Sequence, residues 1–212
     1  MSHYPFKALA AGKPPLIPVI HVENADHAEP VLEALVAAGI GLVEVTLRTT
    51  AAIEVIRRMV KLGSPAIIGA GTITRPEQFD AAVDAGAKFG VGPAFSPSLF
   101  EASRKTGLPF IPGIGTASEA LWAREAGFYE LKLFPAEFVG GIGWFKHIEP
   151  IYPDLIFCPT AGINAANAKD FLGCPNVFAV GGGFLAPRDR IEAEDWAAVE
   201  SLSRQALAAI KD

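Results

Sequence analysis

The sequence has little that would suit a membrane, secreted or nucleic-acid-binding protein. Gly, Pro and charged residues interrupt every apolar stretch well before the roughly 18 residues of a membrane-spanning helix. The two cysteines, Cys158 and Cys174, lack the spacing of a metal site, and the N-terminal stretch lacks a signal-peptide pattern. The 18 basic residues are outnumbered by 23 acidic ones and form no cluster. We therefore expect a cytoplasmic protein with small-molecule partners and with neither nucleic acid nor membrane as a partner.

The sequence does contain enough apolar material for a large core, with 50% hydrophobic residues among 212 and a mean hydropathy of +0.32. β-Branched apolar runs alternate with stretches of helical period, and Gly or Pro marks most junctions. The pattern predicts eight strands, at Leu16–Ile20, Gly41–Leu47, Ala66–Thr72, Lys88–Pro93, Pro109–Ile114, Phe128–Phe134, Leu155–Thr160 and Val177–Gly182. It predicts helices at Asp26–Ala38, Thr50–Lys61, Pro76–Ala85, Pro97–Thr106, Ala117–Ala126, Gly141–Glu149, Asn164–Leu172 and Ala193–Lys211. No linker divides the chain, so we expect one domain over residues 1–212.

Strict alternation of strands and helices predicts an α/β protein with a parallel sheet, and eight repeats are the number that closes a barrel. We therefore predict a single (β/α)8 TIM barrel. The stretch before Leu16 is expected to form a short N-terminal helix that caps the bottom of the barrel. An open doubly wound sheet is the alternative. The turn after Ile20 lacks the G-x-G-x-x-G pattern that such a sheet would use for a dinucleotide.

Charged residues interrupt two of the predicted strands where apolar residues are expected. In the second strand, alternation points Glu44 and, just beyond it, Arg48 into the barrel, while the neighbouring valines face the helices. The same alternation in the sixth strand points Glu130 and Lys132 inward. Burying a lysine ammonium costs several kcal/mol unless it is paired or neutralised, so Lys132 in particular needs an explanation.

Lys132 has two interpretations. The structural one is a buried ion pair with Glu44 or Glu130 that holds the barrel together. The catalytic one starts from its position toward the carboxyl end of a strand, where barrel enzymes build their sites. A buried lysine can lose its proton and attack a carbonyl to form a Schiff base, and a partly buried Glu44 can move the protons that this chemistry requires. Arg48 can hold a carboxylate by a two-pronged contact, and we expect Glu130 to be structural.

Two glycine-containing loops after the seventh and eighth strands are a candidate phosphate site. Barrels commonly bind phosphate there, because backbone N–H groups can approach the anion closely. The expected phosphate-binding residues are Ala161, Gly162, Gly182 and Gly183. The histidines show no ligand spacing, so we expect no metal and no cofactor. His21 ends the first strand and is expected to be a satisfied or partly exposed histidine.

Several segments in this order resemble one known family over nearly the whole chain. They are Pro18-Val19-Ile20, Leu42-Val43-Glu44-Val45-Thr46-Leu47-Arg48-Thr49, Gly69-Ala70-Gly71-Thr72, Ile111-Pro112-Gly113-Ile114, Lys132-Leu133-Phe134-Pro135-Ala136-Glu137 and Phe157-Cys158-Pro159-Thr160. The chain resembles the bacterial class I aldolases that act on 2-keto-3-deoxy-6-phosphogluconate (KDPG) or 4-hydroxy-2-oxoglutarate (KHG).

The resemblance implies a lyase of carbohydrate metabolism, in the Entner–Doudoroff pathway, that cleaves KDPG to pyruvate and D-glyceraldehyde 3-phosphate without a metal. It implies that Lys132 forms the Schiff base and that Glu44 is the general acid and base. It further implies a homotrimer. Five other positions match residues around the pyruvyl carboxylate or the pocket walls: Arg48, Thr72, Pro93, Phe134 and Thr160.

The chain departs from the family pattern at the phosphate end. The family commonly has Gly-Gly where this chain has Ala161-Gly162, and often Ser where it has Gly183. An aldolase for KHG or another non-phosphorylated 2-keto-4-hydroxy acid is therefore an open alternative. A phosphosugar isomerase or epimerase on the same barrel, and a non-catalytic barrel in which Lys132 and Glu44 form a structural pair, are two further alternatives.

Overall fold

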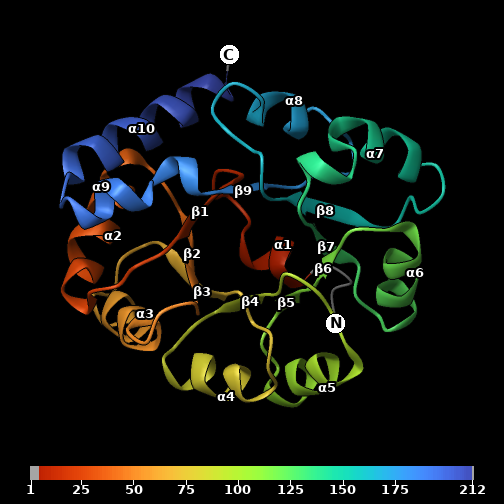
Figure 1. The fold of residues 1–212 in the computed structure, drawn as a ribbon, viewed down its shortest axis with the longest axis horizontal. Helices are drawn as coiled ribbons and strands as arrows, with labels where there is room; N and C mark the ends of the chain where they lie inside the picture. The colour runs from red at the N-terminus through yellow and green to blue at the C-terminus, as the bar shows by residue number, and fades with distance from the viewer. Residues whose placement is uncertain (1–4, 212) are drawn as a thin grey trace.

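The computed structural model describes residues 5–211, and helices surround a ring of parallel strands in it (Figure 1). All eight predicted strands occur, most of them shortened at their ends. The fifth is interrupted at Pro112, which has no backbone N–H to donate to a neighbouring strand. The observed strands are β1 (Leu16–Ile20), β2 (Leu42–Thr46), β3 (Ile67–Gly71), β4 (Phe89–Val91), β5 (Phe110–Ile111), β6 (Gly113–Ile114), β7 (Glu130–Leu133), β8 (Ile156–Pro159) and β9 (Val180–Gly182).

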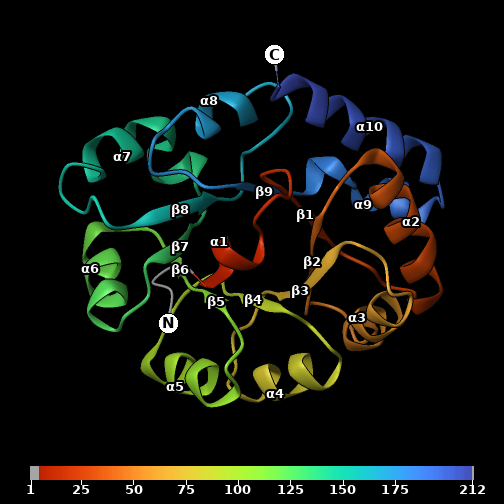
Figure 2. The ribbon, with the colours of Figure 1, turned by 180° about the vertical axis from the view of Figure 1, so that it is seen from behind.

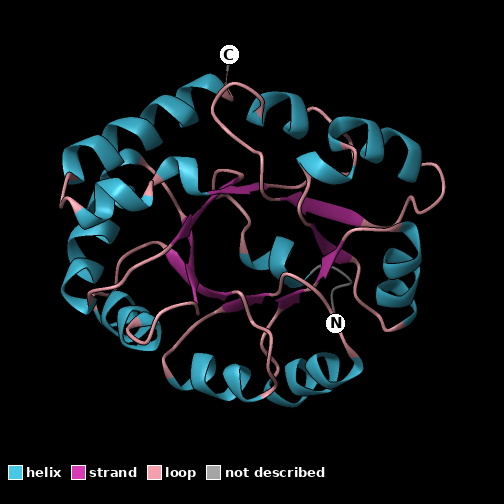
Figure 3. Cartoon of the chain, in the orientation of Figure 1, coloured by secondary structure: helices cyan, strands magenta, loops and turns pink. Residues whose placement is uncertain are grey.

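The strands form two parallel sheets that curl around a common centre. The first has six strands in the order β5-β4-β3-β2-β1-β9 and curls into a half-barrel, and the second has three in the order β6-β7-β8. At one junction β5 and β6 are consecutive segments of chain on either side of Pro112. At the other, β8 approaches β9 through the isolated pairs Phe157–Val177 and Thr160–Gly181. Figure 3 shows the strands around the centre and the helices outside them.

The helices follow the predicted positions closely. They are α1 (Pro5–Leu9), α2 (Ala28–Ala38), α3 (Ala52–Lys61), α4 (Glu77–Asp84), α5 (Pro97–Thr106), α6 (Ala117–Glu125), α7 (Gly141–Ile148), α8 (Ala168–Leu172), α9 (Arg188–Glu192) and α10 (Trp196–Ala209), with short 3₁₀ helices η1 (Ala25–His27), η2 (Glu137–Val139) and η3 (Gly183–Leu185). The prediction missed α9, began α8 at Asn164 rather than Ala168, and began the last helix too early. Asp195 caps α10 by accepting a hydrogen bond from the backbone N–H of Ala198, and Glu194 before it has a φ of 54°, so the helix cannot extend back to Ala193.

The alternation along the strands separates two apolar layers, as predicted. Val43 and Val45 of β2 belong to the larger cluster, which also contains buried residues of the surrounding helices. Leu42 belongs instead to a smaller cluster with Phe89 and Cys158. Because successive strand residues point to opposite sides, Glu44 shares the side of Leu42, and its carboxylate is directed toward the centre of the ring.

The N-terminal helix α1 plugs one end of this centre, as predicted from the sequence. Phe6 is fully buried against Ile17, Leu42 and Phe89, and its ring centroid lies 4.9 Å from that of Phe89. The Glu130 carboxylate accepts hydrogen bonds from the backbone N–H of Phe6 at 2.8 Å and of Lys7 at 2.5 Å. Figure 2 shows α1 inside the ring. Glu130 is therefore structural, as expected, and its partners are the backbone groups that begin α1.

Within residues 5–211, no helix has both the length and the apolar character needed to cross a membrane.

Candidate active site

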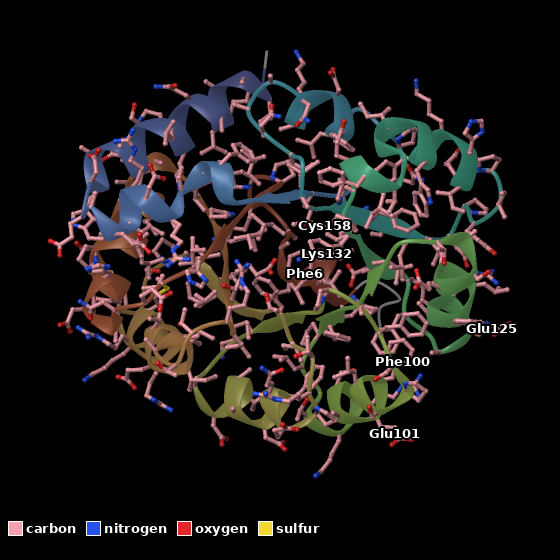
Figure 4. All side chains as sticks on the ribbon, viewed as in Figure 1. Phe6, Phe100, Glu101, Glu125, Lys132 and Cys158 are labelled. Atoms are coloured by element: carbon pink, nitrogen blue, oxygen red, sulfur yellow. The ribbon has the colours of Figure 1, made fainter. Side chains whose placement is uncertain are left out.

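Lys132 and Glu44 meet in the interior, as the sequence predicted. Lys132 lies on β7 and Glu44 on β2, and the Lys132 Nζ is 3.4 Å from the Glu44 Oε1. Only 6% of the lysine side chain and 3% of the glutamate side chain are exposed. Figure 4 shows Lys132 near the middle of the molecule, beside Cys158. In such a pair, shielded from water, the amine can attack a carbonyl carbon and the carboxylate can carry the protons that the reaction moves.

Three glycines make room for polar groups of this interior: Gly71 and Gly113, to which the sequence pattern gave no role, and Gly181, which begins the predicted phosphate loop after the eighth strand. A Cβ at Gly71 on β3 would overlap the Glu44 carboxylate, and a Cβ at Gly113 on β6 would overlap the Pro93 carbonyl group. A Cβ at Gly181 would lie 2.7 Å from the Thr160 Oγ1. The signal for these residues was the glycine itself, since a glycine inside a strand often marks a close approach.

The surroundings of Lys132 are mostly apolar. Its backbone is in register with Gly113 on one side and Cys158 on the other, and its Nζ lies 5.4 Å from the centre of the Phe134 ring. Burial raises the pKa of the Cys158 thiol to about 12, so this cysteine stays protonated and is a core residue rather than a nucleophile. The predicted wall residue Phe134 therefore lies beside the lysine amine, and Pro93 packs against Gly113 of the neighbouring strand β6.

Thr72 and Thr160 end their strands close to this centre. Thr72 follows β3 with a φ of 58°, a left-handed conformation that a β-branched residue rarely adopts. Thr160 is buried, and its Oγ1 has no hydrogen-bond partner within the described chain. A buried hydroxyl without a partner is costly unless a ligand or water completes it. Both threonines are thus consistent with a ligand-facing position.

Arg48 lies two residues beyond β2 and lines a cavity of about 200 Å³ with Val19, His21, Gly183, Ala186 and Arg188. Side-chain hydrogen bonds fix its loop, because Thr46 donates to the Ile20 carbonyl at 2.9 Å and Thr49 donates to the Val22 carbonyl at 2.7 Å. Within residues 5–211 the Arg48 guanidinium has neither an ion pair nor a hydrogen bond. A cation without a partner at the carboxyl ends of β1 and β2 is free to bind an anion.

The four predicted phosphate-binding residues lie in two adjacent loops, but they differ in backbone conformation and in what surrounds them. The Thr160–Gly181 pair brings the two loops side by side. Ala161 and Gly162 have φ values of 74° and 84°, and a Cβ at Gly162 would overlap Glu137. A Cβ at Gly182 would lie 2.6 Å from Phe184, so packing alone accounts for this glycine. Gly183 is the one among the four that lines the 200 Å³ cavity.

Two polar residues of this cavity, His21 and Arg188, had no predicted role in the site. His21 was expected to be a satisfied or partly exposed histidine, and its Nε2 does contact Glu23 at 2.8 Å while its ring lines the cavity. Arg188 begins α9, a helix that the sequence pattern did not predict. The signal that could have found it is a basic residue five positions after Gly183, in the segment that follows the last strand.

The structure also describes a larger cavity of about 640 Å³ outside this centre, between α5 and α6, lined by Phe95, Phe100, Trp122 and neighbouring residues. It contains neither the lysine nor the arginine of the central site. Among residues 5–211, no three or more His, Cys, Asp and Glu side chains gather in a way that could hold a metal ion.

Comparison with known proteins agrees with the geometry. A family model described as "KDPG and KHG aldolase" matches residues 10–202. The 2-dehydro-3-deoxy-phosphogluconate aldolase of Pseudoalteromonas atlantica is 42% identical over 194 residues, which are 92% of this chain and 90% of that protein. The KHG/KDPG aldolase of Escherichia coli K12 is 40% identical over 93% of this chain and 92% of its own length.

A solved structure of a related enzyme has a similar fold. The KDPG aldolase of Legionella pneumophila, crystallised with pyruvate captured at low pH as a covalent carbinolamine intermediate, aligns with a TM-score of 0.89 and 38% identity. The alignment covers 93% of this chain and 95% of that one. The chain belongs to the KDPG and KHG aldolase family.

Proposed function

We propose that the protein is a class I aldolase that cleaves KDPG to pyruvate and D-glyceraldehyde 3-phosphate through a Schiff base on Lys132. The observation that carries the proposal is the buried contact between the Lys132 Nζ and the Glu44 Oε1 at 3.4 Å. The names of the relatives support the reaction, and the covalent carbinolamine in the Legionella pneumophila enzyme supports the chemistry of the intermediate.

In the first half of the reaction, Lys132 becomes covalently attached to the substrate. The Glu44 carboxylate, whose Oε1 lies 3.4 Å from the Lys132 Nζ, accepts the proton that the ammonium must lose. The neutral amine then attacks the C2 carbonyl carbon and forms a carbinolamine. Glu44 returns a proton to the C2 hydroxyl, water leaves, and a protonated imine remains.

In the second half, the protonated imine accepts the electron pair of the C3–C4 bond as that bond breaks. Glu44 takes the C4 hydroxyl proton, directly or through a water, and the aldehyde leaves. It then protonates C3 of the pyruvyl enamine, and hydrolysis of the imine releases pyruvate and regenerates Lys132. The imine supplies the electron sink, so the proposal includes neither metal nor organic cofactor.

The remaining predicted residues hold the substrate in this scheme. Arg48, whose guanidinium has no partner within the described residues, binds the pyruvyl carboxylate together with Thr72. Pro93, Phe134 and Thr160 form the walls around the reacting carbons. Ala161, Gly162, Gly182 and Gly183 surround the far end of the substrate, where the two loops meet.

For the architecture, we propose a closed (β/α)8 barrel in one domain over residues 1–212. The two curled sheets meet at Pro112 on one side and through the Phe157–Val177 and Thr160–Gly181 pairs on the other. Both junctions therefore support closure of the ring. Limited proteolysis should leave one resistant core over most of the length.

KHG is a second candidate substrate, and Gly183 favours it. This position lacks the hydroxyl that the family often has, and a Cβ there would meet only the Val19 carbonyl oxygen at 3.7 Å, so nothing in the packing requires glycine. An isomerase, an epimerase or a non-catalytic barrel would leave the Lys132–Glu44 pair without a covalent role.

Pyruvate release distinguishes these candidates. We expect wild-type protein to release pyruvate from KDPG, from KHG or from both, and the Lys132→Ala variant to release none while keeping its circular dichroism spectrum. A folded wild-type protein that releases pyruvate from neither would contradict the proposal. A Lys132→Ala variant that is inactive only because it unfolds would favour a structural pair.

Two large apolar side chains are exposed on the surface of the protein. We propose a homotrimer in the cytoplasm. The large apolar side chains of Phe138 and Trp122 support an interface, because they are 81% and 57% exposed. Light scattering coupled to gel filtration should give three times the chain mass of 22.4 kDa, and cell fractionation tests the location.

A further inference from the structure

The 200 Å³ cavity beside Arg48 lies at the carboxyl ends of β1, β2 and β9. Val19 is in register with Glu44 across β1 and β2, so the cavity begins in the same layer as the proposed acid–base group. Gly183 immediately follows β9, whose Gly182 is in register with Pro18 of β1. The cavity therefore lies on strands that pair directly with the one carrying Glu44, beside their carboxyl ends.

The wall of this cavity carries two guanidinium groups from different elements. Arg48 follows β2, and Arg188 begins α9. Both proposed substrates have two anionic ends: KDPG carries a carboxylate and a phosphate, and KHG carries two carboxylates. Since Arg48 is assigned to the pyruvyl carboxylate, the second anionic end needs its own partner.

Arg188 is held in place by two carboxylates. Its Nε donates to the Glu192 Oε1 at 2.5 Å, and its Nη2 donates to the Glu23 Oε1 at 3.3 Å. The same Glu23 oxygen contacts the His21 Nε2 at 2.8 Å, so His21, Glu23 and Arg188 form a chain along one wall. The Arg188 Nη1 forms no hydrogen bond within the described residues and remains available to a ligand.

We propose that Arg188 is a specificity-determining residue that binds the anionic group at the aldehyde end of the substrate, whether phosphate or carboxylate. This inference rests on the proposed function and assigns its second anion. The guanidinium is cationic at every relevant pH, and the N–H groups of its Nη1 can donate to an oxygen of either anion. It supplies the charge contact at a mouth where Gly183 offers no hydroxyl.

The two carboxylates that hold Arg188 also limit how strongly it attracts an anion. Glu23 and Glu192 offset part of the guanidinium charge, and 58% of the Arg188 side chain is exposed to water. We therefore expect a contribution of about tenfold in kcat/KM, at the lower end of the range for a charged hydrogen bond.

The test compares Arg188→Gln with a matched control, Arg190→Gln. Arg190 lies on the same short helix, is 49% exposed and pairs with Asp195, but it does not line the cavity. Steady-state kinetics use three substrates: KDPG, KHG and the neutral-ended analogue 2-keto-3-deoxygluconate. Dividing kcat/KM for an anionic substrate by kcat/KM for the neutral one cancels effects of the variant on folding and on the chemical step.

In Arg188→Gln we expect this ratio to fall about tenfold, and in Arg190→Gln to stay within twofold. A fall with KDPG alone identifies phosphate as the recognised group, and a fall with KHG alone identifies carboxylate. An unchanged ratio in Arg188→Gln, or an equal fall in both variants, would overturn the inference.

Binding of inorganic phosphate, measured by calorimetry, separates failure of this inference from failure of the proposed function. We expect the dissociation constant to rise about tenfold in Arg188→Gln and to stay unchanged in Arg190→Gln. If wild-type protein cleaves no substrate yet shows this difference, the proposed function fails and the anion site stands. If cleavage is normal and phosphate binding is the same in all three proteins, the anion site fails.

Discussion

Glu44 fits in the interior only because Gly71, its neighbour on β3, has no side chain. The Cβ of any other residue at position 71 would overlap the Glu44 Oε1, Cγ and Cδ. Glu44 and Gly71 come from adjacent strands, in which Glu44 is in register with Gly69 and Thr46 with Gly71. The position of the proposed acid–base group thus depends on a residue that takes no part in the chemistry.

This relationship predicts a large effect from a small substitution. Gly71→Ala should displace the Glu44 carboxylate from Lys132 and lower kcat by at least a hundredfold, because misplacement of a catalytic group by about 1 Å costs that much. It should also destabilise the protein by about 1–3 kcal/mol through overpacking. Pyruvate release and thermal unfolding measure the two effects.

Gly143→Ala is the matched control for that substitution. Gly143 lies within α7, and a Cβ there would meet nothing within 4 Å. We expect unchanged activity and a gain of about 0.5–1 kcal/mol from the higher helix propensity of alanine. Full activity in Gly71→Ala would show that the position of Glu44 does not matter.

The role of Glu44 itself can be tested with Glu44→Gln. The amide keeps the shape and a hydrogen-bond acceptor for Lys132 but cannot carry a proton between steps. We expect kcat to fall by about 10²–10⁴, the usual contribution of a general acid or base. Glu130→Gln is a suitable control, because Glu130 is equally buried but faces α1, and we expect its activity to stay within a few fold of wild type under folding conditions. Equal losses in the two variants would assign Glu44 a structural role.

Much of the site was predictable because the alternation of side chains along a strand leaves few choices. A charged residue flanked by apolar ones, as in Leu131-Lys132-Leu133, must point to the opposite side from its neighbours. The chain order of the repeats then brings β2 and β7 around one centre. The distance between Lys132 and Glu44 could not be predicted, because it depends on the curl of the sheets and on Gly71.

The parts that sequence reasoning missed are those determined by loops. The helix α9 has five residues, too few for a period to show, and it begins directly after Pro187. The sequence pattern therefore gave no reason to single out Arg188. Glu23 contacts both His21, two positions before it, and Arg188, which lies 165 positions further along the chain. A local sequence pattern cannot predict a contact over such a separation.

Glu130 predicts how stability depends on pH. Burial raises its pKa from the usual value near 4.5 to about 7, although Lys7 and the two backbone N–H groups oppose the shift. The folded protein therefore holds a proton on Glu130 between about pH 4.5 and 7 that the unfolded chain has released. The resulting stabilisation of the fold is complete below the unfolded pKa near 4.5 and is lost as the pH rises through the folded pKa of about 7.

Urea denaturation at pH 5 and pH 8 measures this effect. We expect the free energy of unfolding to fall on the order of 2–3 kcal/mol between the two because of Glu130. Glu130→Gln removes the titrating group, so its free energy of unfolding should change less between pH 5 and pH 8 than that of the wild-type protein. An unchanged pH dependence in the variant would mean that Glu130 titrates normally.

The central claim is that Lys132 forms a covalent adduct with the substrate, and borohydride reduction in the presence of pyruvate tests it most directly. Intact mass and peptide mapping should show one reduced pyruvyl group on Lys132 in wild-type protein and none in Lys132→Ala. The same adduct should form more slowly in Glu44→Gln, because Glu44 assists loss of water from the carbinolamine. A folded wild-type protein with no adduct, or with adducts on exposed lysines only, would contradict the account.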